Sequence, residues 1–159
     1  MIAFTFGRFQ PPTKGHINHI KTMVRYAQQK GIPHTVYISS TVNQDNPLSV
    51  NDRVAILKQA IPEVNVQSAV NMFEVLKYID DDVAYFAGND YKNSQLIENF
   101  CKHATPNSTF VLTGSRIDGI SSTDAKQAAQ VGDLSKFADI LAPVNEETLS
   151  AVFNSIASK

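Results

Sequence analysis

Cysteine is nearly absent from this 159-residue sequence, and so are the features of exported or membrane proteins. The single cysteine, Cys101, has no partner for an internal disulfide, and the helical pattern around it favours an inert, partly buried thiol. The apolar start of the chain stops at Gly7 without a basic leader, and no later apolar run is long enough to cross a membrane. We therefore expect a cytoplasmic protein with no membrane partner.

An excess of charge of one sign is also lacking. Fourteen basic and fifteen acidic residues leave a formal net charge of -1. Such a chain has no global positive field that would gather nucleic acid, so we expect no nucleic-acid partner, and any anionic ligand must be held locally. Repeats and low-complexity linkers are missing too, and this length suits one compact core. We predict a single domain over residues 1–159.

What the sequence does contain is an alternation of strand and helix patterns. Short β-rich runs are followed by stretches with apolar residues at helical spacing, and two amphipathic helices come last. The expected strands cover 2–6, 35–41, 64–67, 83–87 and 109–113, and the expected helices cover 17–27, 50–61, 73–79, 96–101, 121–129, 134–141 and 149–156. Parallel strands need crossover connections, so this order predicts a Rossmann-like α/β fold with a five-stranded parallel sheet, helices on both faces and C-terminal helices.

The loops at the carboxyl ends of parallel strands form the ligand sites of such folds. In this chain they are expected at residues 7–16, 41–49, 88–93 and 114–123. In the first, Gly7 permits close backbone approach, two prolines stiffen the chain, and Gly15-His16 opens a helix whose free amides favour phosphate. Thr13 and His16 are three residues apart, so their side chains can reach the same oxygens. His16 could contact a ligand or cap the helix.

A second polar loop precedes a later helix. Ser121, Ser122 and Thr123 bring three hydroxyls to the N-terminus of that helix, and Lys126 lies one turn beyond Thr123. This arrangement would suit the phosphate tail of a nucleotide. The alternative is a capping box, with Lys126 as a solvated surface residue.

Together, the two loops resemble the signatures of the HxGH-type, cytidylyltransferase-like nucleotidyltransferase superfamily, whose members carry (H/T)xGH after the first strand and ISSTxx(R/K) late in the chain. Thr13-Lys14-Gly15-His16 matches the first signature, and residues 120–126 match the second. Residues 7–11 are similar to nicotinamide mononucleotide adenylyltransferases, whereas Thr13 and Lys126 are similar to phosphopantetheine adenylyltransferases. Small nucleotidyltransferase-like proteins of tailed phages have a similar sequence pattern in the first loop. The resemblance covers residues 2–143.

The resemblance implies a displacement in which a substrate phosphate oxygen attacks the α-phosphorus of a nucleoside triphosphate and releases pyrophosphate. His16 would be catalytic, with Thr13 and Lys126 assisting. The implied nucleotide-binding residues are Gly7, Arg8, Phe9, Gly15, Gly88, Asp90, Ser121, Ser122 and Thr123, and the implied substrate-binding residues are Gln10, Lys14 and Arg53. Mg²⁺ is the expected cofactor, bridged by phosphate oxygens and without side-chain metal ligands.

Several residues keep open alternatives. Arg53 could bind the second substrate or the phosphates, or it could form a salt bridge on a helix surface. Asp90 could touch ribose or order its loop. His16 and His19 lie one turn apart, but two histidines alone make a weak zinc site.

For the reaction we expect transfer of AMP from ATP to a small phosphomonoester, with nicotinamide mononucleotide first, because residues 7–11 are closest to that branch. The alternative within the enzyme class is a cytidylyltransferase acting on a sugar or alditol phosphate. The alternative outside it is a non-catalytic nucleotide-binding domain, against which His16 and the serine cluster argue. The resemblance also admits a homo-oligomer and, for a phage-encoded protein, the host cytoplasm.

Overall fold

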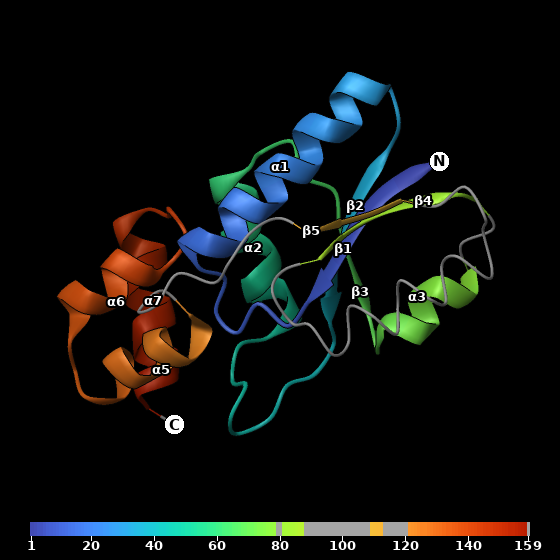
Figure 1. Ribbon diagram of the computed structural model, residues 1–159. Coiled ribbons are helices and arrows are strands. Elements are labelled where there is room, and N and C mark those ends of the chain that lie inside the picture. The colour runs from blue at the N-terminus through green and yellow to red at the C-terminus, as the bar shows by residue number, and fades with distance from the viewer. Residues whose placement is uncertain (79–80, 88–108, 113–120, 159) are drawn as a thin grey trace.

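The computed structural model describes residues 1–78, 81–87, 109–112 and 121–158 (Figure 1). Its sheet has five parallel strands in the order β3-β2-β1-β4-β5. The strands are β1 (Ile2–Gly7), β2 (His34–Ser39), β3 (Val66–Ala69), β4 (Val83–Ala87) and β5 (Thr109–Leu112). The predicted five-stranded parallel sheet is confirmed, although β2 ends at Ser39 rather than Thr41.

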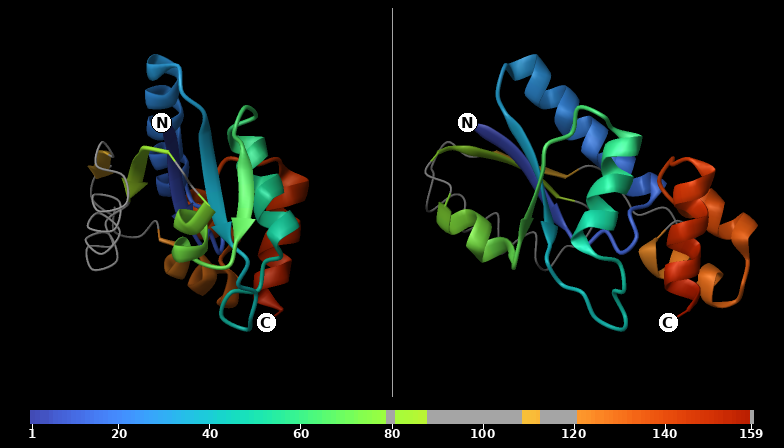
Figure 2. Two further views of the ribbon diagram at one scale, coloured as in Figure 1. Left: turned by 90° about the vertical axis from the view of Figure 1, so that its right-hand side faces the viewer. Right: turned by 180° about the vertical axis from the view of Figure 1, so that it is seen from behind.

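Helices cover both faces of this sheet, as expected (Figures 1 and 2). On one face lie α1 (Lys14–Lys30) and α2 (Val50–Ala60), and on the other lies α3 (Met72–Tyr78). The C-terminal helices α5 (Ser122–Gln130), α6 (Leu134–Ile140) and α7 (Glu146–Ala157) gather beside the start of α1. The helix expected at 96–101, with Cys101, falls outside the described residues. None of the helices that are described combines the length and apolar character needed to span a membrane.

The strands contribute side chains to two hydrophobic cores, because successive side chains of a strand point to opposite faces of the sheet. Ala3 and Phe86 pack in the core under α1 and α2, whereas their neighbours Phe4 and Tyr85 pack in the core beside α3. The rings of Phe4 and Tyr85 lie 5.0 Å apart between their centroids. Burial on both faces explains why β1 and β4 have nearly continuous apolar sequences.

The C-terminal helices are fastened to the loop that precedes α1. The amide of Ala142 donates to the carbonyl of Pro12 at 3.1 Å, and Thr13 forms an isolated β-bridge with Leu141. Within this group of helices, α5 contributes three buried alanines to the main core, and Phe137 of α6 is completely buried. The entrance to α1 is therefore held between the sheet and the C-terminal helices.

Candidate active site

The start of α1 is a capping box in which histidine replaces the usual Glu or Gln. The Thr13 hydroxyl accepts a hydrogen bond from the His16 amide at 3.4 Å, and the Thr13 amide donates to Nδ1 of His16 at 3.0 Å. Because Nδ1 accepts, the neutral imidazole carries its hydrogen on Nε2. The capping alternative for His16 is confirmed, and the cap makes Nε2 a donor. Thr13 is only 2% exposed and caps the helix, and its assisting role in catalysis stays a prediction.

The ring of Phe9 packs against this imidazole, with centroids 4.9 Å apart and planes at 86°. Phe9 has a left-handed backbone with φ 51°, and its side chain is buried. A Cβ at Gly7 would lie 2.9 Å from Cζ of Phe9, so the glycine leaves room for the ring. Gly7 and Phe9 therefore help to place His16, and the nucleotide contacts expected of these two residues stay predictions.

Gln10 joins the first loop (residues 7–16) to the second loop (residues 41–49). Its Nε2 donates to the carbonyl of Leu48 at 2.8 Å and to that of Thr41 at 3.2 Å, while its Oε1 accepts from the Leu48 amide at 2.9 Å. The side chain is buried, and both of its polar atoms are used in these bonds. Gln10 therefore links the two loops, and the substrate contact expected of it stays a prediction.

Arg53 of α2 is fully buried and holds the same two loops. Its Nη1 donates to the carbonyls of Arg8 at 2.8 Å and Ser39 at 2.6 Å, and its Nε donates to that of Ser49 at 3.2 Å. Burial lowers the pKa of the guanidinium from its usual value. The surface salt bridge considered for Arg53 is corrected, since the guanidinium is buried and donates to backbone carbonyls. The ligand contact considered for Arg53 stays a prediction.

A second capping box starts α5. The Ser121 hydroxyl accepts from the Asp124 amide at 3.1 Å and donates to the Asp124 carboxylate at 2.6 Å. The Ser122 hydroxyl donates to the carbonyl of Pro11 at 2.8 Å and ties α5 to the first loop. The capping alternative is confirmed here too. Both hydroxyls donate within the fold, and the first amides of α5 stand beside them. The nucleotide contacts expected of Ser121 and Ser122 stay predictions.

Lys126 reaches from α5 to the second loop, where its Nζ donates to the carbonyl of Asp45 at 2.9 Å. Asp45 belongs to a tight turn in which the Asn43 side chain accepts from the amides of Asp45 and Asn46. Lys126 is thus more than a solvated surface residue. Together with the bond between Ser122 and Pro11, this contact brings α5, the first loop and the second loop to one junction.

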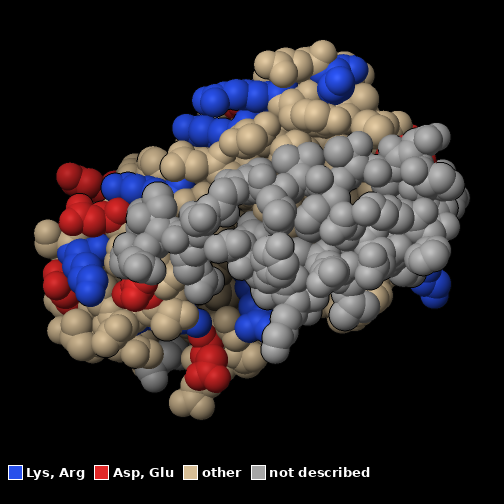
Figure 3. Space-filling model, in the orientation of Figure 1, with Lys and Arg blue, Asp and Glu red and all other residues tan. Residues whose placement is uncertain are grey.

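Positive and small residues stay exposed around the junction. Arg8, Lys14, Gly15 and Thr123 all have exposed side chains or backbone. Lysine and arginine side chains gather along α1 in Figure 3, and the first turn of α1 contains no acidic residue. This end of α1 therefore presents both helix amides and cations to an anion. The predicted Gly88 and Asp90 contacts lie outside the described residues.

His19 does not join His16 in a metal site. It turns toward the sheet, where its Nε2 forms a 2.8 Å hydrogen bond with the Thr5 hydroxyl. Burial lowers the pKa of His19 to about 4, although a hydrogen bond with the backbone of Phe86 opposes part of that shift. Among the described residues, no three His, Cys, Asp or Glu side chains come together as metal ligands.

Sequence reasoning missed the acceptors that tie the loops together. They are the backbone carbonyls of Pro11, Ser39 and Asp45. No residue type marks such acceptors, since every residue carries a carbonyl. The exception is the turn around Asp45, where the succession of Asn and Asp residues is typical of a tight turn and could have been noticed.

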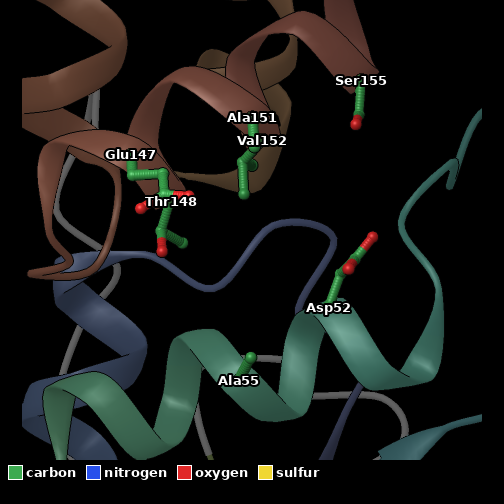
Figure 4. A pocket seen from close by; sticks show the side chains of 7 residues that line it. All are labelled: Asp52, Ala55, Glu147, Thr148, Ala151, Val152 and Ser155. Carbon is green, nitrogen blue, oxygen red and sulfur yellow. The ribbon is translucent and has the colours of Figure 1, made fainter.

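A separate cavity of about 280 Å³ lies between α2 and α7 (Figure 4). Its walls include Asp52 and Ala55 from α2 and Glu147, Thr148 and Val152 from α7. None of the residues predicted for the active site lines it. The cavity is therefore a gap between two helices and forms no part of the loop junction.

A cytidylyltransferase-like family model matches residues 4–128, which include both capping boxes and the loops that they hold. The chain belongs to the cytidylyltransferase-like family. It is thus a nucleotidyltransferase by family, in agreement with the resemblance stated for its two loops. No curated protein shows a significant match to the sequence.

Solved structures share the fold. A bifunctional NMN adenylyltransferase/ADP ribose pyrophosphatase from Francisella tularensis is 18% identical with a TM-score of 0.69, and 99% of this chain spans 52% of it. A protein from Vibrio parahaemolyticus assigned as a nicotinate-nucleotide adenylyltransferase is 18% identical with a TM-score of 0.66, over 99% of this chain and 96% of that one. Thermotoga maritima TmcAL, solved with alpha-thio ATP, is 12% identical with a TM-score of 0.62, over 99% and 56%. At these identities the likeness shows the fold alone.

Proposed function

We propose that this chain transfers AMP from ATP to a small phosphomonoester, with nicotinamide mononucleotide as the first candidate, and releases pyrophosphate. The observation that carries the proposal is the bond between Ser122 and Pro11, which brings the N-termini of α1 and α5 to one edge of the sheet. Helix N-termini attract phosphate through their free amides and their dipoles. Two of them side by side suit a ligand with several phosphates.

The choice of ATP and of a mononucleotide acceptor is supported by the structural neighbours. Two of them are named for NMN or nicotinate-nucleotide adenylyltransferase activity, and a third was solved with alpha-thio ATP. Residues 7–11 of this chain point to the same branch. We propose the same base and acceptor class here, with CTP as the competitor that the test must include.

His16 would stabilise charge on the α-phosphate. Its Nε2 carries the hydrogen because the Thr13 amide occupies Nδ1, so the ring is set to donate to a non-bridging oxygen as negative charge accumulates there. The first amides of α1, beside the exposed Gly15, would bind the same phosphate. The acceptor phosphate then attacks phosphorus directly, and no covalent enzyme intermediate is needed.

The leaving phosphates would lie at α5. The amides of Ser122 and Thr123 head this helix, and Lys126 would add a positive charge after exchanging the Asp45 carbonyl for a phosphate oxygen. Of the two exposed cations in the first loop, Arg8 would bind the nucleotide and Lys14 would draw the acceptor phosphate. These cations neutralise charge locally, as a chain with a net charge of -1 requires.

We include Mg²⁺ in the proposal as an ion that arrives with the triphosphate. No group of three metal-ligating side chains is present among the described residues, so these residues do not fit a protein cage for the ion. Mg²⁺ commonly binds substrate phosphates and keeps several waters, which suits this arrangement. No step of the proposal depends on a protein-bound metal.

The test is pyrophosphate release in the presence of Mg²⁺, with ATP or CTP as donor and a panel of acceptors. The panel contains nicotinamide mononucleotide, nicotinate mononucleotide, phosphopantetheine and an alditol phosphate, and mass spectrometry identifies each product. We expect release with ATP and a pyridine mononucleotide, and much less from the His16→Gln variant. Release only with CTP and the alditol phosphate would replace the proposal with a cytidylyltransferase. No release with any pair would favour a nucleotide-binding domain without catalysis.

A further inference from the structure

Arg53 is a buried cation whose charge is met by no carboxylate of the described residues. It is fully buried, and the ion pair found in the described part of the chain joins the N-terminus to Asp81 instead. A buried guanidinium normally needs an acidic partner. Here backbone carbonyls replace it, at 2.6 Å from Ser39, 2.8 Å from Arg8 and 3.2 Å from Ser49. Within the described residues, the charge of Arg53 is therefore met by backbone carbonyls at the place where the two loops meet.

One of these carbonyls leads directly to the candidate catalytic histidine. The Arg8 carbonyl is part of the peptide bond between Arg8 and Phe9, so Arg53 holds the backbone next to Phe9. The φ angle of Phe9 is 51°, a conformation that a phenylalanine keeps only when its surroundings hold it. The Phe9 ring in turn stands perpendicular to the His16 imidazole at 4.9 Å. Arg53 and His16 are thus joined by one hydrogen bond, one constrained residue and one ring contact.

We propose that Arg53 is a positioning residue that sets the orientation of the His16 imidazole by holding the Arg8 carbonyl and, through it, the ring of Phe9. The capping bond from the Thr13 amide fixes the position of Nδ1. The Phe9 ring restricts the tilt of the imidazole plane, and therefore the direction in which Nε2–H points. The catalytic consequence of this arrangement rests on the proposed function, whereas the geometric part does not.

The shape of the guanidinium is what this role requires. Nη1 donates to the carbonyl of Arg8, which follows β1, and to that of Ser39, which ends β2. Nε donates to the carbonyl of Ser49. The ammonium of lysine is a point donor on a flexible stem and cannot reproduce this planar fork. Arg53→Lys therefore keeps the charge and loses the geometry. A matched control is Lys58→Met, which removes an exposed cation from the same helix.

The experiment compares wild type, Arg53→Lys and Lys58→Met in two ways. In turnover, we expect Arg53→Lys to lower kcat by about 10- to 100-fold with a much smaller change in the KM for ATP, as displacement of a catalytic group predicts. Lys58→Met should behave as wild type. By nitrogen-15 NMR of the imidazoles, we expect the His16 signals to shift in Arg53→Lys while those of His34 remain in place.

Phe9→Leu tests the same series of contacts if Arg53→Lys fails to fold, because it removes the ring contact and leaves Arg53 intact. We expect the same change of the His16 signals in Phe9→Leu. The proposal is overturned if folded Arg53→Lys keeps wild-type kcat and His16 signals, or if Phe9→Leu leaves those signals unchanged. The NMR comparison needs no substrate. If no donor and acceptor pair supports turnover, the proposed function fails, while the NMR result still decides the role of Arg53.

Discussion

The hydroxyl of Ser122 donates a 2.8 Å hydrogen bond to the carbonyl of Pro11, which lies 111 positions earlier in the chain. This bond joins the start of α5 to the loop that precedes α1. In this bond the side chain of Ser122 supports the junction of the two segments. The two segments that resemble nucleotidyltransferase signatures are in direct contact.

Ser122→Ala tests this contact. We expect the free energy of unfolding to fall by about 1 kcal/mol, the usual net value of one hydrogen bond, because the Pro11 carbonyl loses its donor. The KM for the nucleotide should rise several-fold as α5 shifts relative to the first loop. Urea denaturation and initial-rate kinetics measure the two effects. Thr123→Val, at the exposed neighbouring position, should leave stability within about 0.5 kcal/mol of wild type. Equal stability of Ser122→Ala and wild type would contradict the structural role.

His16→Gln separates the two tasks of His16. Glutamine at the third position of a helix can accept the amide of the capping residue, so it should preserve the bond that the Thr13 amide now gives to Nδ1. We expect stability close to wild type but a fall in kcat of about 10²- to 10³-fold, because the donor to the phosphate is lost. His16→Ala should lose the same activity and also about 1 kcal/mol of stability. Thermal denaturation and pyrophosphate release provide the measurements, and a fully active His16→Gln would remove the imidazole from the mechanism.

Most of the fold could be predicted from the sequence because its periodic patterns are strong. α1 buries Ile17, Ile20 and Val24 on one stripe and ends at Gly31 with φ 66°, as the spacing and the glycine indicated. The ends of short strands were less certain. β3 begins at Val66, two positions after the run that predicted it, because Val64 is instead buried in the turn before the strand.

The proximity of the predicted loops follows from the fold, but the contacts within them could not be predicted. The structure joins the loop before α1 to the start of α5 through Ser122, and α5 to the second loop through Lys126. Gln10 and Arg53, predicted to bind a substrate, also hold backbone carbonyls of the two loops. Whether a polar side chain faces outward or into a loop junction depends on tertiary packing, which a single sequence does not encode in its spacing.

Gly7→Ala and Gly15→Ala should have opposite effects on stability. A Cβ at position 7 would meet the Phe9 ring at 2.9 Å, whereas the nearest atom that one at position 15 would meet among the described residues is the Thr13 hydroxyl, at 3.6 Å. We expect Gly7→Ala to lose about 1–3 kcal/mol through overpacking and to lower kcat, because the ring that orients His16 must move. We expect Gly15→Ala to gain up to about 1 kcal/mol, since alanine favours the helix, while the KM for the nucleotide rises.

Chemical denaturation measures the free energy of unfolding of the two glycine variants, and steady-state kinetics measures their KM for the nucleotide. The informative result is that Gly15→Ala should be more stable than wild type and yet bind nucleotide less well, because a methyl group stands near the exposed amides of α1. A Gly15→Ala variant with an unchanged KM would place the phosphate elsewhere. A Gly7→Ala variant as stable as wild type would show that the Phe9 ring can move without cost.

His19 should make the fold sensitive to acid. The Thr5 hydroxyl donates to the carbonyl of Phe86 at 2.7 Å, so it accepts from Nε2 of His19 at 2.8 Å and places the imidazole beside the sheet. Burial lowers its pKa from 6.5 to about 4. The unfolded chain therefore binds this proton first as the pH falls. The stability that neutral His19 contributes is complete above pH 6.5 and is lost progressively toward pH 4.

The size of the effect follows from the shift, at about 1.4 kcal/mol for each pKa unit, so roughly 3 kcal/mol are lost over the whole range. His19→Gln can still donate to Thr5 but cannot titrate, so it should lose less stability than wild type between pH 7.5 and pH 4.5. Urea denaturation at the two pH values measures the loss of unfolding free energy in each protein. Titration of the carboxylates contributes equally to both losses and cancels when the two are compared. Parallel losses in wild type and His19→Gln would mean that His19 does not control the acid sensitivity. A steeper loss in wild type would instead assign that sensitivity to one buried imidazole next to the central strand.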